Sequence, residues 1–380
     1  MNDMQTGLSK TILQVAVNGS MIKINANVAN YPDDFPTVNS ESNVYGHRAN
    51  DGCWTQSFWT GILWLAFELT GEEAHKALAT KHTQSFTDRL VGNVALETHD
   101  IGFLYSLSCV ADYRITGSEL AKTTGIAAAD KLLDRFKEKG EFIQAWGPNG
   151  DPDMHRLIID CYMNLPLLYW ATEVTGDNKY AEAATKHAHS ARKVLLRENN
   201  STFHTFYFDY ETGAPTKGVT AQGYADDSCW SRGQAWGIYG MALSYKYTKD
   251  PIFIEEFYKI ADYFIDHLPT DKVAYWDLYF TEGDEDRDSS AAAIAVCGIL
   301  EMLTYLDDEK TAKYQKVADD IMASLIESYT SFSLPEANGL LLHGVYSKPG
   351  NRGVDEMMLW GDYYFMEALT RYSMDWKPYW

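Results

Sequence analysis

Six segments of the chain are apolar around most of their circumference when they are drawn as helices. A helix of that kind is buried on several sides, whereas a surface helix carries a single apolar stripe. Alternation typical of strands is limited to short pieces such as FHTFYFDY and VAYWDLYF. The pattern therefore predicts an all-α protein. The six buried segments span residues 58–71, 100–117, 160–176, 232–249, 288–307 and 359–372.

More polar, amphipathic segments follow the buried ones, for example EEAHKALATKHTQSFTDRL and NKYAEAATKHAHSARKVLL. Their acidic residues lie early, where they favour the helix dipole. The first three buried segments end in Thr-Gly, and glycine ends a helix readily because it adopts the left-handed conformation. Six inner helices that alternate with outer ones predict an (α/α)6 barrel, in which each pair buries its apolar faces against its neighbours.

An open helical solenoid is the alternative to a closed barrel. The repeats differ in length and carry long, distinctive loops at one end, which favours the barrel. No Ser/Gly-rich linker interrupts the chain. We therefore expect residues 1–380 to form a single (α/α)6-barrel catalytic domain.

The cysteines, the N-terminal residues and the net charge indicate the compartment and the class of partner to expect. The five cysteines are scattered and show no metal-ligand spacing, so we interpret them as buried thiols in a reducing compartment. The first residues do not have the pattern of a secretory signal. The sequence also contains no run of about 18 apolar residues, the length that a membrane-spanning helix needs. A cytoplasmic protein is expected, as a monomer or a homodimer. The net charge of −21 argues against nucleic acid or an anionic membrane as a partner, but a local basic pocket can still bind a small anion.

Two acidic residues at the starts of predicted inner helices are the strongest candidates for chemistry. Asp100 follows Thr98-His99, and Asp160 lies within the apolar run IIDCYM. Both would lie on one rim of a barrel, and paired carboxylates are the usual equipment for acid/base work on a sugar. Burial among apolar neighbours would raise the pKa of Asp160, as a general acid requires. The alternatives are a helix cap for Asp100 and a structural hydrogen bond for Asp160.

A third cluster, QGYADDSCWSRGQAW, begins the fourth buried segment. Its Arg232 can pair with a carboxylate, and its tryptophans offer faces on which a sugar can stack; the alternative is an interhelical ion pair beside core aromatic rings. Other candidates lie in loops before or between the helices. The candidate residues outside the acidic pair are Trp54, Trp146, His204, Gln222, Trp230, Arg232, Trp236 and Tyr346.

No sequence motif predicts a metal or a cofactor. The chain has no HExxH, no glycine-rich phosphate loop and no GxSxG. Asp226, Asp227 and Asp277 are isolated acids without a calcium-loop spacing, and Asp288 begins DSSAAAI as a helix cap would. We therefore expect neither a metal nor a cofactor.

Long motifs in a fixed order resemble the unsaturated glucuronyl hydrolases of glycoside hydrolase family 88. They are HDIGFLYSLS, IQAWGPNGDPD, IIDCYMNLPLLYWA, HTFYFD and RGQAWGIYG, and the resemblance extends from FWTGILW to LWGDYYFMEAL. It implies an (α/α)6 barrel that removes a 4,5-unsaturated uronic acid from disaccharides and short fragments left by polysaccharide lyases. It also implies that Asp160 is the general acid/base, that Asp100 is the second essential carboxylate, and that His99 joins the other candidates in the substrate pocket.

The chemistry that the resemblance implies is hydration of a double bond. Asp160 would protonate C4 of the unsaturated sugar and assist water in adding at C5, after which the hemiketal opens and the sugar linkage breaks. Relatives that prefer sulfated fragments carry a Ser…Ser-x-Lys cluster before the last helix. Here Ser347 remains, Gly350 replaces the second serine and Arg352 replaces the lysine. Ser347 and Arg352 are therefore further candidates for contact with the substrate.

Three alternatives to this function stay open from the sequence. A related enzyme would act on unsaturated galacturonyl-rhamnose from pectin with the same barrel and acid pair. A non-catalytic helical toroid would bind sugars or protein partners through its aromatic rim. A conventional inverting glycosidase would use the same scaffold on saturated substrates.

Overall fold

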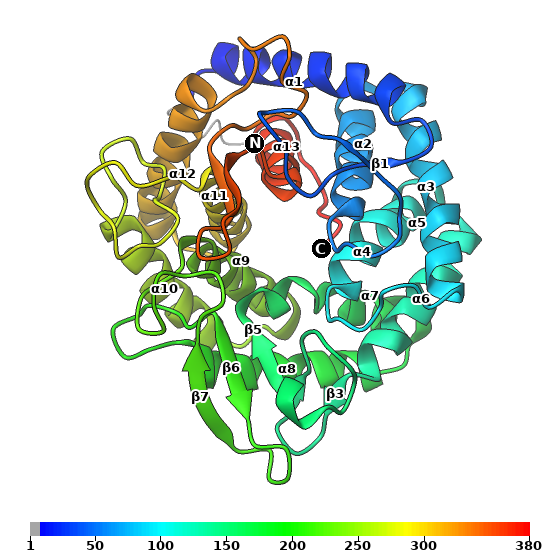
Figure 1. Ribbon diagram of the computed structural model, residues 1–380, viewed down its shortest axis with the longest axis vertical. Helices are drawn as coiled ribbons and strands as arrows, with labels where there is room; N and C mark the ends of the chain where they lie inside the picture. The colour runs from blue at the N-terminus through cyan, green and yellow to red at the C-terminus, as the bar shows by residue number, and fades with distance from the viewer. Residues whose placement is uncertain (1–7) are drawn as a thin grey trace.

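The computed structural model describes residues 8–380, and within them helices alternate between an outer and an inner ring (Figure 1). The outer ring consists of α1 (Lys10–Asn30), α3 (Glu73–Val91), α6 (Glu119–Leu133), α8 (Lys179–Leu195), α10 (Ile252–Asp266) and α12 (Asp308–Ser328). The inner ring consists of α2 (Gln56–Thr70), α4 (Ile101–Tyr105) with η1 (Ser106–Val110) and α5 (Ala111–Thr116), η3 (Ile159–Met163) with α7 (Pro166–Thr175), α9 (Ser231–Thr248), α11 (Ser289–Leu303) and α13 (Leu359–Ser373).

The ring closes on itself. The last inner helix, α13, packs against the first, α2, and also against α11 and the outer helix α1. An open solenoid would leave α13 and α2 far apart, so that alternative is wrong and the predicted (α/α)6 barrel is confirmed. Inner and outer helices differ in burial as their sequences predict: 13 of the 15 residues of α11 are buried, against 7 of the 17 residues of α8.

The predicted helix ends are also confirmed. Gly71, Gly117 and Gly176 each follow an inner helix with φ between 71° and 75°, the left-handed conformation expected of Thr-Gly. Two predicted inner helices are less regular than a single α-helix. The second inner helix contains the π-helical turn η1, and the third begins as the 3₁₀ turn η3 before α7 starts at Pro166, a residue suited to a first helical position.

Short antiparallel strands occupy the loops at one end of the barrel. They are β1 (Phe35–Pro36) with β2 (His47–Arg48), β3 (Phe136–Lys137) with β4 (Phe142–Ile143), β5 (Arg156–Ile158) with β6 (Thr205–Phe208) and β7 (Pro215–Val219), and β8 (Gly344–Ser347) with β9 (Arg352–Glu356). The 3₁₀ turn η2 (Pro152–Met154) precedes β5. FHTFYFDY forms β6 as its alternation predicts, whereas VAYWDLYF forms only isolated bridges. The predicted loop from Ser347 to Arg352 is the turn of the β8–β9 hairpin.

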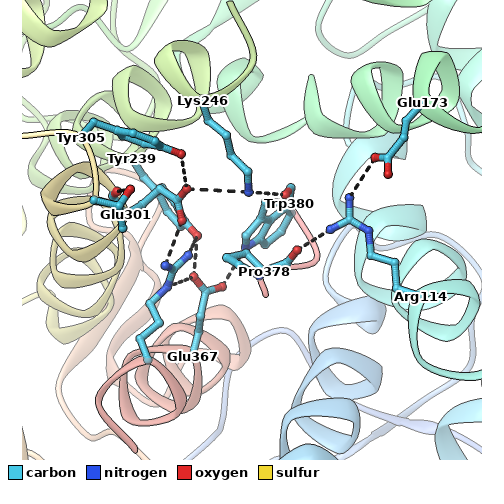
Figure 2. A network of polar contacts seen from close by, with 11 residues as sticks. Arg114, Glu173, Tyr239, Lys246, Glu301, Tyr305, Glu367, Pro378 and Trp380 are labelled. Carbon is cyan, nitrogen blue, oxygen red and sulfur yellow. Dashed lines mark hydrogen bonds and ion pairs between the residues drawn. The ribbon is translucent and has the colours of Figure 1, made fainter. Parts of the chain in front are cut away.

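Residues after α13 turn back into the ring, and Trp380 is fully buried there. Its indole Nε1 donates to Glu367 at 2.7 Å, and its backbone oxygen accepts from Lys246 at 2.9 Å. Figure 2 shows that Trp380, Lys246 and Glu367 belong to a larger polar network that includes Glu301. Arg371 pairs in it with Glu301 at 2.9 Å and with Glu367 at 3.0 Å. Charged side chains are thus buried in the barrel interior, but each has a partner of opposite charge.

All five cysteines are buried and free, as interpreted from the sequence. Among the helices of residues 8–380, none combines the length and the apolar content that crossing a membrane requires. The expectation that the chain lacks a secretory signal rests partly on residues 1–7, which lie outside the described residues.

Candidate active site

A pocket at the rim of the inner ring gathers most of the residues predicted from the sequence. It opens where the inner helices begin, so that loops distant in sequence each supply a side chain. Ile158 also lines it and was not predicted, whereas His99, Ser347 and Arg352 do not line it. The predicted residues that line the pocket are Trp54, Asp100, Trp146, Asp160, His204, Gln222, Trp230, Arg232, Trp236 and Tyr346.

Asp100 and Asp160 come together because two inner segments approach each other closely. A Cβ added at Gly102 would lie 2.3 Å from the Cα of Asn164, so the contact requires glycine. The Asn164 side chain joins the segments: Oδ1 accepts from the backbone N–H of Phe103 at 2.8 Å, and Nδ2 donates to the backbone oxygen of Asp160 at 3.4 Å. The motifs HDIGF and IIDCYMN therefore form one unit that carries both carboxyl groups.

His99 lies behind the two carboxyl groups and contacts both. Its Nε2 is 3.3 Å from Asp160 Oδ1 and 3.5 Å from Asp100 Oδ1, and its side chain is only 1% exposed. Burial by itself would lower the pKa of His99, but the charges of Asp160 and Asp100 outweigh it and raise the pKa above its ordinary value. A proton on Nε2 is therefore favoured, and the imidazole holds the two carboxyl groups in place.

Asp100 occupies the N-cap position of α4, but its side chain makes no capping hydrogen bond. Its Oδ2 accepts from the Thr98 hydroxyl at 2.7 Å, while Oδ1 faces His99. The alternative of a helix cap is therefore wrong. Burial raises the pKa of Asp100 to about 6, although the charge of His99 acts in the opposite direction. Asp100 consequently changes its protonation state close to neutral pH.

Asp160 lies on the 3₁₀ turn η3 and keeps 20% of its side chain exposed. Its Oδ1 is buried and, apart from the contact with His99, has no hydrogen-bond partner among residues 8–380. His99 is therefore the one side chain of residues 8–380 that holds this oxygen, so a structural hydrogen bond to Asp160 can come only from the imidazole that also contacts Asp100. A carboxyl group that touches an imidazole on one side and the pocket on the other is placed to exchange a proton with a ligand.

Arg232 forms the interhelical ion pair that was the alternative interpretation of its sequence cluster. Its guanidinium donates to Asp288 at 2.5 Å, to Gln222 at 2.8 Å and to the backbone oxygens of Val345 and Tyr346. Asp288 also accepts from the backbone N–H of Ser290 at 3.2 Å and caps α11 as predicted. Arg232 still lines the pocket, but its four terminal N–H groups are occupied by protein acceptors.

Aromatic rings form the walls of the pocket. Trp54 stacks on Trp360 with ring centroids 5.1 Å apart, and its Nε1 donates to the Tyr346 hydroxyl at 3.3 Å. Trp236 packs against Phe103 at 5.6 Å and is buried. Trp360 and Phe103 were not predicted as site residues because their sequences read as ordinary helix core. Such flat, partly apolar walls suit the faces of a sugar ring.

His204 is buried beside Trp230, with ring centroids 4.8 Å apart. Its Nδ1 contacts the Thr205 hydroxyl at 2.6 Å, and its Nε2 has no partner among the described residues. Burial lowers the pKa of His204 to about 4, and the nearby charges of Arg232 and Arg156 act in the same direction. The imidazole is therefore neutral near pH 7 and offers one free nitrogen to a ligand.

Trp146 is the most exposed aromatic wall, with 42% of its surface accessible. Arg135 fixes its loop by donating to the backbone oxygens of Ala145 at 2.7 Å and Gly147 at 3.0 Å. The guanidinium of Arg156 lies 3.4 Å from the centre of the Trp146 ring. Neither arginine was predicted. Arg156 stands just before the IIDCYM motif, and its charge in that apolar run was the available signal.

The β8–β9 hairpin places Ser347 and Arg352 at the edge of the site. Arg352 lies 4.1 Å over the ring of Tyr346 and has no ion pair within residues 8–380. Ser347 Oγ accepts from the backbone N–H of Gly350 at 3.3 Å. Lys348, the other cation of this hairpin, forms an ion pair with Asp286. Arg352 is therefore the cation that this hairpin presents next to the pocket.

One group of residues in the site has the spacing of metal ligands, although the sequence predicts no metal site. His99, Asp100 and Asp160 offer ligand atoms within 4.8 Å of one another. The orientation of His99 Nε2 toward both carboxyl groups, with a raised pKa, fits a proton between them better than a cation. Two of the isolated acids have structural partners: Asp277 accepts from Ser228 Oγ at 2.7 Å, and Asp226 accepts from the backbone N–H of Thr220 at 2.7 Å.

Comparison with known protein families assigns the chain to one of them. Residues 23–375 match the model of Glycosyl Hydrolase Family 88. The chain belongs to this family. The match extends from within α1 to beyond α13 and includes both carboxyl groups and the aromatic walls, so the resemblance seen in the sequence motifs is confirmed.

Relatives in the family are similar over nearly their full length. An unsaturated chondroitin disaccharide hydrolase of Streptococcus pyogenes serotype M1 is 46% identical over 98% of this chain and 94% of its own. A crystal structure of an unsaturated glucuronyl hydrolase from Streptococcus agalactiae has a TM-score of 0.96 and 47% identity, again over 98% and 94% of the two chains. A variant of that enzyme, solved in complex with dGlcA-GalNAc6S, has a TM-score of 0.88 and 44% identity over the same shares.

Proposed function

We propose that this protein removes a 4,5-unsaturated glucuronic acid from the non-reducing end of lyase-generated disaccharides and short oligosaccharides. The observation that carries the proposal is the meeting of Asp100 and Asp160 on one buried imidazole, at a pocket with aromatic walls. Family 88 relatives with hydrolase names support the same activity.

In this proposal Asp160 is the general acid/base. Its carboxyl group donates a proton to C4 of the double bond, and water adds its oxygen to C5 while returning a proton to Asp160. The hemiketal at C5 then opens to a ketone, and the former ring oxygen becomes a hydroxyl group on C1. Collapse of the hemiacetal at C1 releases the second sugar and leaves an aldehyde. One water is consumed, and Asp160 ends protonated as it began.

Asp100 and His99 support this cycle. A pKa of about 6 allows Asp100 to share a proton with His99 near neutral pH, so that the charge next to Asp160 can follow the proton transfer. The neutral His204 and the amide of Gln222 offer hydrogen bonds to the hydroxyl groups of the uronate. Trp54, Trp146, Trp230 and Trp236 provide stacking faces, a common arrangement in sugar sites.

We infer that the second sugar belongs to the chondroitin type and can carry sulfate. A relative is named as a chondroitin disaccharide hydrolase, and another was solved with dGlcA-GalNAc6S. In this chain the unpaired Arg352 over Tyr346 replaces the lysine of the Ser…Ser-x-Lys cluster. A guanidinium binds an oxyanion with two parallel hydrogen bonds, which suits a sulfate group.

We further propose that residues 1–380 work as one catalytic domain without a metal or cofactor, in the cytoplasm, as a monomer or homodimer. Five free, buried cysteines fit a reducing compartment.

The test is incubation with unsaturated disaccharides prepared by lyases from chondroitin, hyaluronan, heparin and gellan. We expect loss of the ultraviolet absorbance of the double bond, fastest with the chondroitin substrates. Turnover of unsaturated galacturonyl-rhamnose alone would move the assignment to pectin fragments. Binding without turnover of any substrate would indicate a sugar-binding toroid.

A further inference from the structure

The guanidinium of Arg156 is buried without the partners that the other buried arginines have. Arg89, Arg135 and Arg232 each donate four hydrogen bonds to carbonyl, amide or carboxylate oxygens. Arg156 is 5% exposed and donates only to the hydroxyl of Tyr207 and to the thioether of Met154.

The guanidinium of Arg156 has hydrogen-bond donors that no acceptor in the described part of the chain uses. Its Nε is buried without a hydrogen-bond partner, and within residues 8–380 no carboxylate oxygen lies within 4.0 Å of its nitrogens. A thioether sulfur is a weak acceptor. Leaving a buried charge without a counter-ion is costly. This chain has 53 acidic residues, so the absence of an acidic partner at this position is a specific property of the site.

Arg156 lies directly behind the pocket wall. The backbone N–H of Ala145 donates to the backbone oxygen of Arg156 at 2.9 Å, which sets Trp146 against the guanidinium at 3.4 Å. Arg156 and Ile158 are two residues apart on β5, so their side chains share one face of the sheet. Because Trp146 and Ile158 both line the pocket, the charge of Arg156 acts on a ligand that stacks on Trp146.

We propose that Arg156 is a specificity-determining residue for anionic sugars, whose unbalanced positive charge behind Trp146 is neutralised when the substrate's carboxylate or sulfate enters the pocket. The inference rests on the proposed function. Burial lowers the pKa of His204, a residue that lines the pocket; the charge of Asp160 opposes this, and the charges of Arg232 and Arg156 act in the same direction as burial, which agrees with the proposal.

The experiment separates charge from packing. Arg156→Gln keeps a planar hydrogen-bonding group without charge, whereas Arg156→Lys keeps the charge without the planar group. The substrates are an unsaturated chondroitin disaccharide, its uronate methyl ester, and the 6-sulfated disaccharide. We expect Arg156→Gln to lower kcat/KM about tenfold on substrates with a free anion, mainly through KM, and less than twofold on the unsulfated ester. Arg156→Lys should restore most of the activity.

The matched control is Lys217→Gln. Lys217 is exposed and lies 5.6 Å from the centre of the Tyr207 ring. Its replacement therefore removes one positive charge from the same sheet at a residue that does not line the pocket. We expect it to change kcat/KM less than twofold on all three substrates. A loss confined to the sulfated disaccharide in Arg156→Gln would identify sulfate as the anion, and a loss shared by the unsulfated acid would identify the carboxylate.

Two results would overturn the inference. A loss on the methyl ester as large as the loss on substrates with a free anion, or an Arg156→Lys variant as impaired as Arg156→Gln, would show that Arg156 only supports Trp146. Calorimetric binding of the 6-sulfated disaccharide, which carries both anions, to Asp160→Asn with and without Arg156→Gln gives the same comparison without turnover. About tenfold weaker binding supports the inference, and unchanged binding contradicts it. Failure of the wild-type enzyme on every substrate would instead reject the proposed function.

Discussion

Removal of the buried Trp380 indole should destabilise the whole barrel. The ring is fully buried, stacks on Tyr364 with centroids 6.1 Å apart and touches Phe103 and Tyr363 edge-on. Its Nε1 donates to Glu367, a fully buried carboxylate (Figure 2). Trp380→Ala therefore leaves a cavity and removes a hydrogen bond from a buried charge.

The two losses can be estimated separately. A buried Trp→Ala substitution costs roughly 3–5 kcal/mol through lost contacts and the remaining cavity. A hydrogen bond to a charged group contributes about 1.5–3 kcal/mol. Trp380→Ala should thus lower the free energy of unfolding by about 4.5–8 kcal/mol, a large part of the total of roughly 5–15 kcal/mol for a typical domain. Trp380→Phe keeps most of the ring and should cost about 2–3 kcal/mol.

Urea unfolding followed by far-ultraviolet circular dichroism measures both variants. The control is Met374→Ala in the same segment, because Met374 is exposed and should change the unfolding free energy by less than about 0.5 kcal/mol. A Trp380→Ala variant within about 1 kcal/mol of the wild type would refute the reasoning, because it would mean that the segment after α13 does not stabilise the ring.

Four further predictions follow from the site. Gly102→Ala should reduce kcat/KM at least about a hundredfold by forcing the Asp100 and Asp160 segments apart, since its Cβ would lie 2.3 Å from Asn164; Gly46→Ala, in an open loop, serves as control. Activity should persist after exhaustive chelation, and loss that a defined divalent ion restores would reveal a metal at His99. Arg352→Ala should lower kcat/KM about tenfold more on sulfated than on unsulfated disaccharides, whereas equal losses would mean that Arg352 only supports its hairpin. Burial raises the pKa of Asp100 from 3.8 to about 6, so the stability that its carboxyl group contributes is present below pH 4 and is lost as the pH rises through 6. Asp100→Asn cannot ionise, so its unfolding free energy should rise relative to that of the wild type across this range, by up to about 3 kcal/mol. Urea titrations at several pH values measure the difference.

The barrel could be predicted from the sequence because its determinants are local. The apolar circumference of the inner helices and the Thr-Gly ends at Gly71, Gly117 and Gly176 each specify one helix and its end. Once helices alternate in a ring, residues at the starts of the inner helices must face one rim. That geometry, rather than any single motif, explains why ten predicted residues line one pocket.

What the sequence did not predict depends on partners far along the chain. Lys348 stands four residues before Arg352 in the same hairpin, but it binds Asp286, 62 residues away, and so differs from Arg352, which has no ion pair among the described residues. Asp100 has the sequence position of a helix cap, yet the contact of Gly102 with the third inner segment turns its carboxyl group toward His99. The sequence around Arg156 could not show that its guanidinium lacks an ion-pair partner, because only the fold determines which carboxylates lie near it.

The central claim is that Asp160 adds water across a carbon–carbon double bond and that cleavage of the sugar linkage follows. The most direct measurement records ultraviolet absorbance and release of the second sugar in the same reaction, for the wild type and Asp160→Asn. We predict one double bond lost for each sugar released, with both rates about two to four orders of magnitude lower in Asp160→Asn and its fold intact. Release of the sugar while the absorbance remains, or near-normal turnover in Asp160→Asn, would contradict the account.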